Sequence, residues 1–343
     1  MNSSLSDVGV VIIGRNEGER FERCLASLAG KAAAMVYVDS NSTDGSPEKA
    51  RVAGAQVVSL DTSIPFSMGR ARNEGVEALL KLGSFKHIQF VDGDCGVDAG
   101  WMARAQDFLN SNPGYAAVCG RRKERFPEHS IYNRICDFEW NTPIGDADSC
   151  GGDVLFGMED FRSVGGFDAQ LIAGEEPELC FRIRKHGKKI RRIDFPMTYH
   201  DANILHFGQW WKRLIRGGYG AVASWQRCGG NRRAPFASQI RSAYLWGAVW
   251  PFLCAFTFVV AVISSKPYAW PMLGVFLLAG VIQTLRIARQ SMRRGLDGKT
   301  SLLRALLLFQ GKMAQWIGIM RYTKDRLQGQ QGKIIEYKTA GTP

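Results

Sequence analysis

The sequence predicts an α/β protein with a doubly wound, Rossmann-like sheet, followed by a C-terminal pair of apolar helices that could form a transmembrane hairpin. Apolar runs alternate with segments of helical periodicity over roughly the first third of the 343 residues, which is typical of a parallel sheet covered by helices. Two later stretches, residues 242–265 and 267–285, contain no charged side chain. Each is long enough to cross a bilayer.

The elements of the sheet follow in order along the chain. Strands are expected at residues 8–13, 35–38, 56–60, 86–92 and 116–120, and helices at residues 21–28, 46–53, 66–82 and 99–110. The first helix illustrates the signal, because Phe21, Cys24, Leu25 and Leu28 follow i, i+3, i+4, i+7 spacing and Gly30 stops the pattern.

The composition limits the class of partner. The formal net charge is +12 and the pI is near 9.4, which favours nucleic acid, an anionic membrane or a phosphate-rich substrate. No nucleic-acid-binding motif is present, so we expect no nucleic-acid partner. The eight cysteines form no C-x-x-C pair and residues 1–7 show no signal-peptide pattern. Both features indicate reduced thiols in a cytosolic compartment, without a disulfide frame or a zinc site.

Acidic residues stand where the predicted strands end. Asp92 and Asp94 flank Gly93, which lets the backbone approach a bulky ligand. Carboxylate oxygens suit Mg²⁺ or Mn²⁺, ions that are usually shared with substrate phosphates. Glu17 and Asp39 also follow strands, so all four acids should gather at one edge of the sheet. The alternative is that Asp92-Gly93-Asp94 is an ordinary polar turn.

Basic residues near these acids have two interpretations. Arg70 and Arg72 stand near the start of the third predicted helix, at residues 66–82, where they could meet a diphosphate or form a solvated face. The cluster of Arg121, Arg122, Lys123 and Arg125 is interpreted as a solvated face. These predictions are open to a direct structural check.

Several motifs in order resemble a family-2 glycosyltransferase with the GT-A fold. The N-terminal motifs are Val11-Ile12-Ile13-Gly14-Arg15-Asn16-Glu17, then Val38-Asp39-Ser40-Asn41-Ser42-Thr43-Asp44-Gly45, then Asp92-Gly93-Asp94. Downstream, Cys150-Gly151-Gly152-Asp153 and Val164-Gly165-Gly166-Phe167-Asp168 look like the acceptor-side segment of that family. Gly174-Glu175-Glu176-Pro177-Glu178 looks like its acidic motif at a helix start. The resemblance covers roughly residues 8–220.

The resemblance implies roles for the nucleotide-binding residues. Arg15, Glu17 and Asp39 would contact the nucleotide of the donor, together with Arg72. Asp92 and Asp94 look like the ribose and metal ligands, with Asp94 the stronger candidate for the ion.

The resemblance also implies a proton acceptor. Glu176 sits where the family places its catalytic base, with Glu175 beside it. Many members have Glu-Asp here, so the choice between Glu175 and Glu176 stays open. The alternative is an acidic pair that only stabilises the start of a helix.

Two features after the acidic motif also have alternatives. His200 is a further metal or diphosphate ligand or a structural hydrogen-bonding residue. The basic aromatic segment that includes Gln209, Trp210, Trp211 and Arg213 loosely resembles the Gln-x-x-Arg-Trp element of processive members, in a different order, which puts polymer extrusion in doubt. Gln209 and Arg213 are predicted to contact the donor, and the segment is expected to be a lid, an interfacial helix or both.

The C-terminal part predicts a membrane anchor. Arginines precede and follow the two apolar stretches, which places both flanks and the catalytic domain on the cytoplasmic side of a bacterial inner (plasma) membrane. The alternative is two buried helices of a soluble core. Residues 301–322 predict an amphipathic interfacial helix, and the tail from Gln328 is expected to be polar and mobile. The predicted domains are a catalytic domain (1–225), a basic linker (226–241), the hairpin (242–285) and an interfacial segment (286–343).

Together these features predict an inverting, metal-dependent glycosyltransferase. The donor would be a UDP- or GDP-linked sugar, and the single base with no nucleophilic carboxylate predicts one displacement with inversion. The extended region 120–175 favours a lipid-linked glycan as acceptor. A polyprenyl-phosphate sugar synthase is the alternative in this class, and a non-catalytic nucleotide-binding membrane protein is the alternative from another class.

Overall fold

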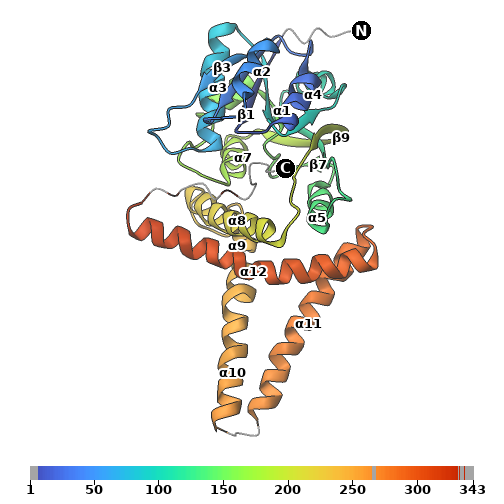
Figure 1. Cartoon of the computed structure of the whole chain (residues 1–343), viewed down its shortest axis with the longest axis vertical. Helices are drawn as coiled ribbons and strands as arrows, with labels where there is room; N and C mark the ends of the chain where they lie inside the picture. Colours follow the sequence, from blue (N-terminus) through green and yellow to red (C-terminus); the bar gives the residue numbers. More distant parts are fainter. Residues whose placement is uncertain (1–6, 265–267, 331, 333–335, 337–343) are drawn as a thin grey trace.

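The computed structural model describes residues 7–264, 268–330, 332 and 336. An α/β domain carries the N-terminal two thirds of the chain, α12 (Gly298–Leu327) runs across its base, and two long helices project away from it (Figure 1). The predictions for residues 1–6, for Lys266 between the two apolar stretches and for most of the tail beyond Gln330 fall outside the described residues.

The α/β domain is built on one mixed sheet of nine strands. Its strands are β1 (Val8–Gly14), β2 (Ala34–Asp39), β3 (Gln56–Ser59), β4 (His87–Asp92), β5 (Cys95–Val97), β6 (Tyr115–Glu124), β7 (Gly145–Asp146), β8 (Val154–Gly157) and β9 (Lys189–His200). The spatial order is β3-β2-β1-β4-β8-β6-β9-β5, with β7 on β9. Strands β1 to β4 pair in parallel, whereas β8 runs antiparallel to both neighbours. All five predicted strands are therefore confirmed.

Helices cover both faces of the sheet. They are α1 (Glu19–Leu28), α2 (Ser46–Val52), α3 (Met68–Leu82), α4 (Trp101–Ser111), α5 (Ile131–Trp140), α6 (Met158–Ser163) and α7 (Glu175–Lys185). Apolar residues of α3, α6 and α7 form one core with the sheet, and those of α1, α2 and α4 form the core of the other face. The fold is thus the α/β class that the sequence predicted, with its strand ends free to carry a site.

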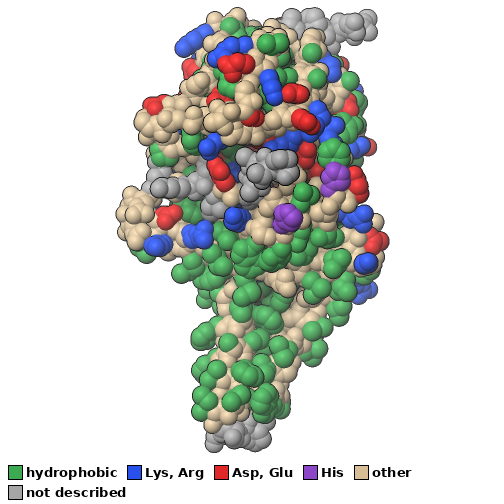
Figure 2. Space-filling view, viewed as in Figure 1, with side chains coloured by type: hydrophobic (Ala, Val, Ile, Leu, Met, Phe, Trp, Pro, Cys, Tyr) green, Lys and Arg blue, Asp and Glu red, His purple; other side chains and the backbone are tan. Residues whose placement is uncertain are grey.

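Two helices are long and apolar enough to cross a membrane. One runs from Ala237 to Ile263 and combines α9 (Ala237–Tyr244), a π-helical segment (Leu245–Val249) and α10 (Trp250–Ser264). The other is α11 (Ala269–Arg293). Only 17% of the apolar window of each is buried, so neither helix lies in the core of the described structure. Figure 2 shows hydrophobic side chains covering the projecting helices and charged side chains gathered on the α/β domain.

The first long helix begins earlier than the charge-free stretch at residue 242. It passes through a π-helical turn immediately before Pro251, where the N–H of Trp250 bonds to the carbonyl of Leu245. Proline has no N–H to donate to the preceding turn, and a π-turn is one way a helix accommodates that loss.

The helix α12 packs tightly on α8 (Phe207–Arg227). A Cβ atom at Gly218 would lie 2.0 Å from the carbonyl oxygen of Gln315, and one at Gly318 would lie 2.1 Å from the carbonyl oxygen of Ile215. These glycines let the backbones of α8 and α12 touch. The helix α12 lies between the α/β domain and the projecting helices (Figure 1).

Candidate active site

The carboxyl ends of β1, β2 and β4 meet at one rim of the sheet. Asp39 lies in register with the last residue of β1, and Asp92 lies in register with Ile13. Gly93 donates its N–H to the Ile13 carbonyl at 2.8 Å, and a Cβ at Gly93 would lie 3.4 Å from Cγ of Glu17. The turn after β4 therefore packs directly on the turn after β1, and Glu17, Asp39 and Asp92 share one edge.

Arg72 joins the strand-end acids to the acidic motif. This side chain from α3 is 1% exposed. Its Nη2 donates to Oδ1 of Asp92 at 2.7 Å, and its Nη1 donates to Oε1 of Glu175 at 2.9 Å. Burial opposes its charge, but the two carboxylates hold the pKa of Arg72 above its ordinary value. One guanidinium thus brings together two motifs that are distant in sequence.

A second arginine holds Asp92 from the other side, and the sequence analysis placed it wrongly on a solvated face. Arg122 on β6 donates to Oδ2 of Asp92 at 3.0 Å and to Oδ2 of Asp153 at 2.9 Å. Asp153 is fully buried, accepts the N–H of Asp92 at 3.0 Å and accepts the hydroxyl of Thr198 at 2.8 Å. Burial opposes ionisation of Asp92, but Arg72 and Arg122 hold its pKa below the ordinary value.

Asp94 and His200 form a separate pair beside this network. Nε2 of His200 lies 3.2 Å from Oδ2 of Asp94, and each residue is less than a tenth exposed. Behind the imidazole, Nδ1 lies 3.7 Å from a carboxylate oxygen of Glu124, and the ring of Trp140 packs against it edge to face. The end of β9 thereby orients His200 toward Asp94. Their role as ligands of one ion stays a prediction.

Glu176 is hydrogen-bonded to the segment of residues 150–152, which passes close to Asp92. Its Oε1 accepts the N–H of Cys150 at 2.6 Å and contacts the thiols of Cys150 at 3.2 Å and Cys180 at 2.9 Å. Two residues later in that segment, a Cβ at Gly152 would lie 2.6 Å from Nη2 of Arg72 and 3.0 Å from Oδ2 of Asp92. The loop between Cys150 and Gly152 therefore connects Glu176 to the rim.

The predicted nucleotide contacts occupy the outer part of the rim. Asp39 accepts the backbone N–H groups of Asn41 and Ser42 at 3.1 and 3.0 Å, which shapes the loop after β2. Glu17 pairs with Arg20 at 3.0 Å, and Arg15 is partly exposed and pairs with Glu336 at 2.8 Å. These acids and Arg15 border the same edge, and their roles toward a nucleotide stay predictions.

The described contacts of Gln209 and Arg213 are with the start of α8 and with α5. The side chain of Gln209 accepts the N–H groups of Leu205 and His206 and closes the capping box of α8. Arg213 stacks over Trp210 and faces Glu139 of α5. Their predicted contact with the donor stays a prediction.

Two other predictions from the sequence need correction. Trp210 is fully buried against Tyr132, so it belongs to the core and not to a lipid interface. Arg70 is also buried, and it bonds to Glu74 and to the carbonyls of Asp61 and Ile64. Its hydrogen bonds hold the loop before α3 and do not reach the rim.

Sequence reasoning missed Arg122 and Glu124 as residues of the site. Strand β6 runs to Glu124, four residues beyond the predicted end at residue 120. The basic cluster was therefore assigned to the surface when it belongs to a strand that pairs with β9. The signal was available in principle, because a strand places alternate residues on one face and Arg122 and Glu124 are two apart.

The chain is similar to known glycosyltransferases. Residues 9–154 match the family described as Glycosyl transferase family 2. The chain is 26% identical over 238 residues to glycosyltransferase AglE of Haloferax volcanii, which covers 66% of this chain and 76% of that protein.

Among solved structures, the fold is similar to the mannosyltransferase PcManGT of Pyrobaculum calidifontis, solved in complex with GDP-Man and Mn²⁺. The identity is 17% and the TM-score 0.53, with 94% of this chain and 87% of that one covered. The likeness supports the fold, with a GT-A sheet followed by C-terminal helices. Residues 9–154 thus carry the features of glycosyltransferase family 2, and the protein is a glycosyltransferase that moves a sugar from a nucleotide-sugar donor.

Proposed function

We propose that the protein is an inverting, metal-dependent glycosyltransferase that moves a sugar from a UDP- or GDP-linked donor to a lipid-linked glycan at the cytoplasmic face of a bacterial inner membrane. The observation that carries the proposal is the ion-pair chain from Asp92 through Arg72 to Glu175. It places the strand-end acids beside the acidic motif, so a diphosphate and a proton acceptor can lie on either side of one sugar.

The pair of Asp94 and His200 would hold the Mg²⁺ or Mn²⁺ ion. Two cis ligands at bond lengths near 2.1 Å on an octahedral ion lie about 3 Å apart, and the two side-chain atoms here are 3.2 Å apart. The residues therefore fit such an ion. When bound, the ion would neutralise charge that develops on the leaving diphosphate. The related mannosyltransferase of Pyrobaculum calidifontis was solved with GDP-Man and Mn²⁺, which supports this class of donor and ion.

Glu176 is the proposed base. In the displacement, the acceptor hydroxyl oxygen forms a bond to the anomeric carbon, the bond from that carbon to the diphosphate oxygen breaks, and the hydroxyl proton passes to Glu176. Glu175 is engaged by Arg72 and would position that guanidinium against Asp92. Glu176 accepts bonds only from neutral donors among the described residues, namely the N–H of Cys150 and two thiols.

The two long apolar helices support a membrane-bound acceptor. Arg232 and Arg233 precede the first of them, Arg241 lies near its start in α9, and Arg289 and Arg293 stand at the end of α11. Basic residues at both flanks are typical of the cytoplasmic side. The amphipathic α12 would then lie along the membrane surface between the anchor and the α/β domain. A donor in the cytosol and an acceptor carried by a lipid would meet at the membrane surface, close to α12.

The test uses the full-length protein in membranes supplied with a panel of UDP- and GDP-sugars. Nucleotide release and mass spectrometry of the extracted lipids would be followed with and without Mn²⁺. We expect Mn²⁺-dependent release that Asp94→Asn abolishes, together with a glycosylated lipid-linked product. A sugar attached directly to a polyprenyl phosphate would identify the lipid phosphate, and not a lipid-linked glycan, as the acceptor. If no nucleotide is released with any donor, the proposal is contradicted.

A further inference from the structure

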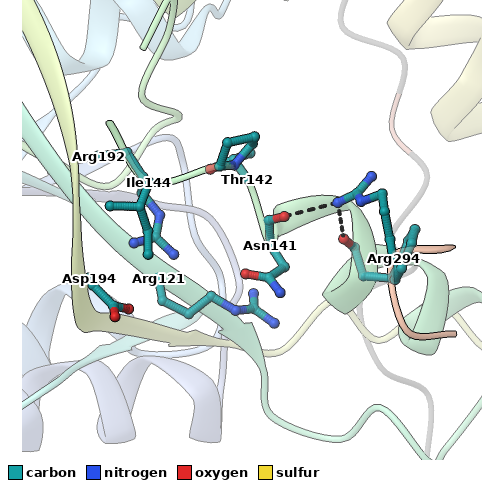
Figure 3. A pocket seen from close by; sticks show the side chains of 9 residues that line it. Arg121, Asn141, Thr142, Ile144, Arg192, Asp194 and Arg294 are labelled. Atoms are coloured by element: carbon teal, nitrogen blue, oxygen red, sulfur yellow. Dashed lines mark hydrogen bonds between the residues drawn. The ribbon is translucent and has the colours of Figure 1, made fainter. Parts of the chain in front are cut away.

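A polar pocket is lined by residues other than those of the candidate active site. Its volume is about 530 Å³, and its lining includes three arginines, Arg121, Arg192 and Arg294, with Asp194. Figure 3 shows Arg121 and Arg192 reaching it from the strands, and Arg294 approaching from the far side of Asn141. Arginine side chains from β6, from β9 and from the end of α11 thus line one pocket.

Arg192 on β9 is the unusual member. It is 2% exposed, and within the described residues its Nε has no hydrogen-bond partner and its guanidinium forms no ion pair with a carboxylate. Its Nη1 donates to the carbonyl of Ile193. Burial lowers the pKa of Arg192 and the neighbouring Arg121 acts in the same direction, whereas Cys119 and Asp194 act in the opposite direction and only partly offset this. A buried cation with an unused donor is costly unless an anion lies beside it.

Of the other two arginines, Arg294 is the one whose partners carry no negative charge. Arg294 donates to the carbonyl oxygens of Asn141 at 2.9 Å and Phe138 at 3.4 Å, and its guanidinium lies 4.4 Å from the centre of the Phe138 ring. These partners are neutral and do not cancel its charge. Arg121 pairs with Asp137 at 2.9 Å.

We propose that this pocket is a second anion site, which binds the phosphate group of a phosphate ester. The planar fork of arginine matches the oxygens of phosphate, and several arginines around one hollow are the usual way to hold it. The phosphate could come from a lipid headgroup or from a soluble phosphate compound. The position favours a lipid source, because Arg294 directly follows α11, one of the two helices long enough to cross a membrane.

The experiment compares the two sources on the full-length protein in detergent. Inorganic phosphate and the short-chain lipid dihexanoyl phosphatidylglycerol would each be titrated, and binding followed by the rise in the unfolding temperature. The variants are Arg294→Gln, which removes one exposed cation, and Ile144→Trp, which fills the pocket mouth without a change of charge. Arg289→Gln is the matched control, because it removes an exposed arginine of α11 outside the pocket.

We expect saturable binding to the wild-type chain and to Arg289→Gln, and binding weakened about tenfold or more in Arg294→Gln and Ile144→Trp. Tighter binding of the lipid than of inorganic phosphate identifies a headgroup as the source, and the reverse order identifies a soluble phosphate compound. The site is overturned if neither probe binds, or if Arg294→Gln and Arg289→Gln weaken binding equally.

Discussion

At the scale of single residues, the adjacent acids Glu175 and Glu176 have different partners, and we expect different roles for them in the reaction. Glu175 is bonded to a guanidinium that also holds Asp92, whereas Glu176 contacts a backbone N–H and two thiols. The first arrangement suits a residue that positions the site, and the second suits a residue that can turn toward an acceptor. Variants of the two should therefore differ in kind.

We expect Glu176→Gln to lower kcat by about 10²–10⁴-fold while donor affinity is retained, because removal of a general base affects only the chemical step. Glu175→Gln should weaken donor binding as well, since Arg72 loses one of its two carboxylates. Steady-state kinetics with nucleotide release and titration of the donor separate these effects. Unchanged turnover in Glu176→Gln would remove Glu176 from the base role.

A second prediction concerns the dependence of stability on pH. The pKa of Asp92 is lower in the folded chain than its ordinary value near 3.9. The ionised carboxylate therefore stabilises the fold at pH values above about 4, and this contribution is lost as the pH falls through the folded pKa. The difference in free energy of unfolding between wild type and Asp92→Asn should be largest near neutral pH and should shrink below pH ~4. Denaturant unfolding of both proteins checks this, and a difference that is constant with pH would contradict it.

The residues of the rim could be predicted because each follows an apolar strand directly. Asp39 and Asp92 needed only a strand pattern and the rule that parallel strands end at one edge. Arg122 could not be placed in the same way, because its partners Asp92 and Asp153 come from other strands. Trp210 looked interfacial in sequence, since an aromatic residue beside basic residues has the same local pattern whether it faces lipid or the core.

At the scale of elements, a continuous apolar run allowed some strands to be predicted. The strands β1, β2 and β4 each carry such a run. In contrast, β5, β7 and β8 span three, two and four residues, and their place in the sheet depends on their partners. Each pairs with a strand far away in sequence, and such pairing depends on tertiary packing that no local window contains.

The contact between α8 and α12 offers a test at this scale. Gly218→Ala would force a Cβ into the carbonyl of Gln315, and overpacking of this kind typically costs about 1–3 kcal/mol. The neighbouring Gly217 is exposed with no atom near its would-be Cβ, so Gly217→Ala should be neutral or stabilising by up to ~1 kcal/mol. Thermal unfolding of the detergent-solubilised variants gives the comparison. Equal unfolding temperatures would show that the close packing of these helices is unimportant.

At the scale of the whole molecule, the proposed donor site belongs to the α/β domain, from which the two apolar helices project. The α/β domain, α12 and the two projecting helices follow one another along the long axis (Figure 1). Because the flanks of the helices are basic, we expect them to enter and leave the membrane on the same side. The anchor would then hold the catalytic domain at a fixed distance from the membrane that contains the acceptor lipid.

This topology predicts the accessibility of two positions. A cysteine at the exposed Tyr268, before α11, should react with a membrane-impermeant maleimide added to the outside of intact cells. A cysteine at the exposed Lys299, in the first turn of α12, should react only after lysis. The parent chain is the blank, since six of its eight cysteines are buried. Labelling of both positions from the same side would mean that the two helices do not cross the bilayer.

The most direct test of the central claim is the position of a bound ion. Crystals or frozen particles of the full chain would be prepared with Mn²⁺ and a nucleoside diphosphate, and the ion located by its anomalous signal or density. The account predicts one Mn²⁺ about 2.2 Å from both Oδ2 of Asp94 and Nε2 of His200, bridging to the diphosphate. An ion or a diphosphate bound away from the rim of β1, β2 and β4 would contradict it.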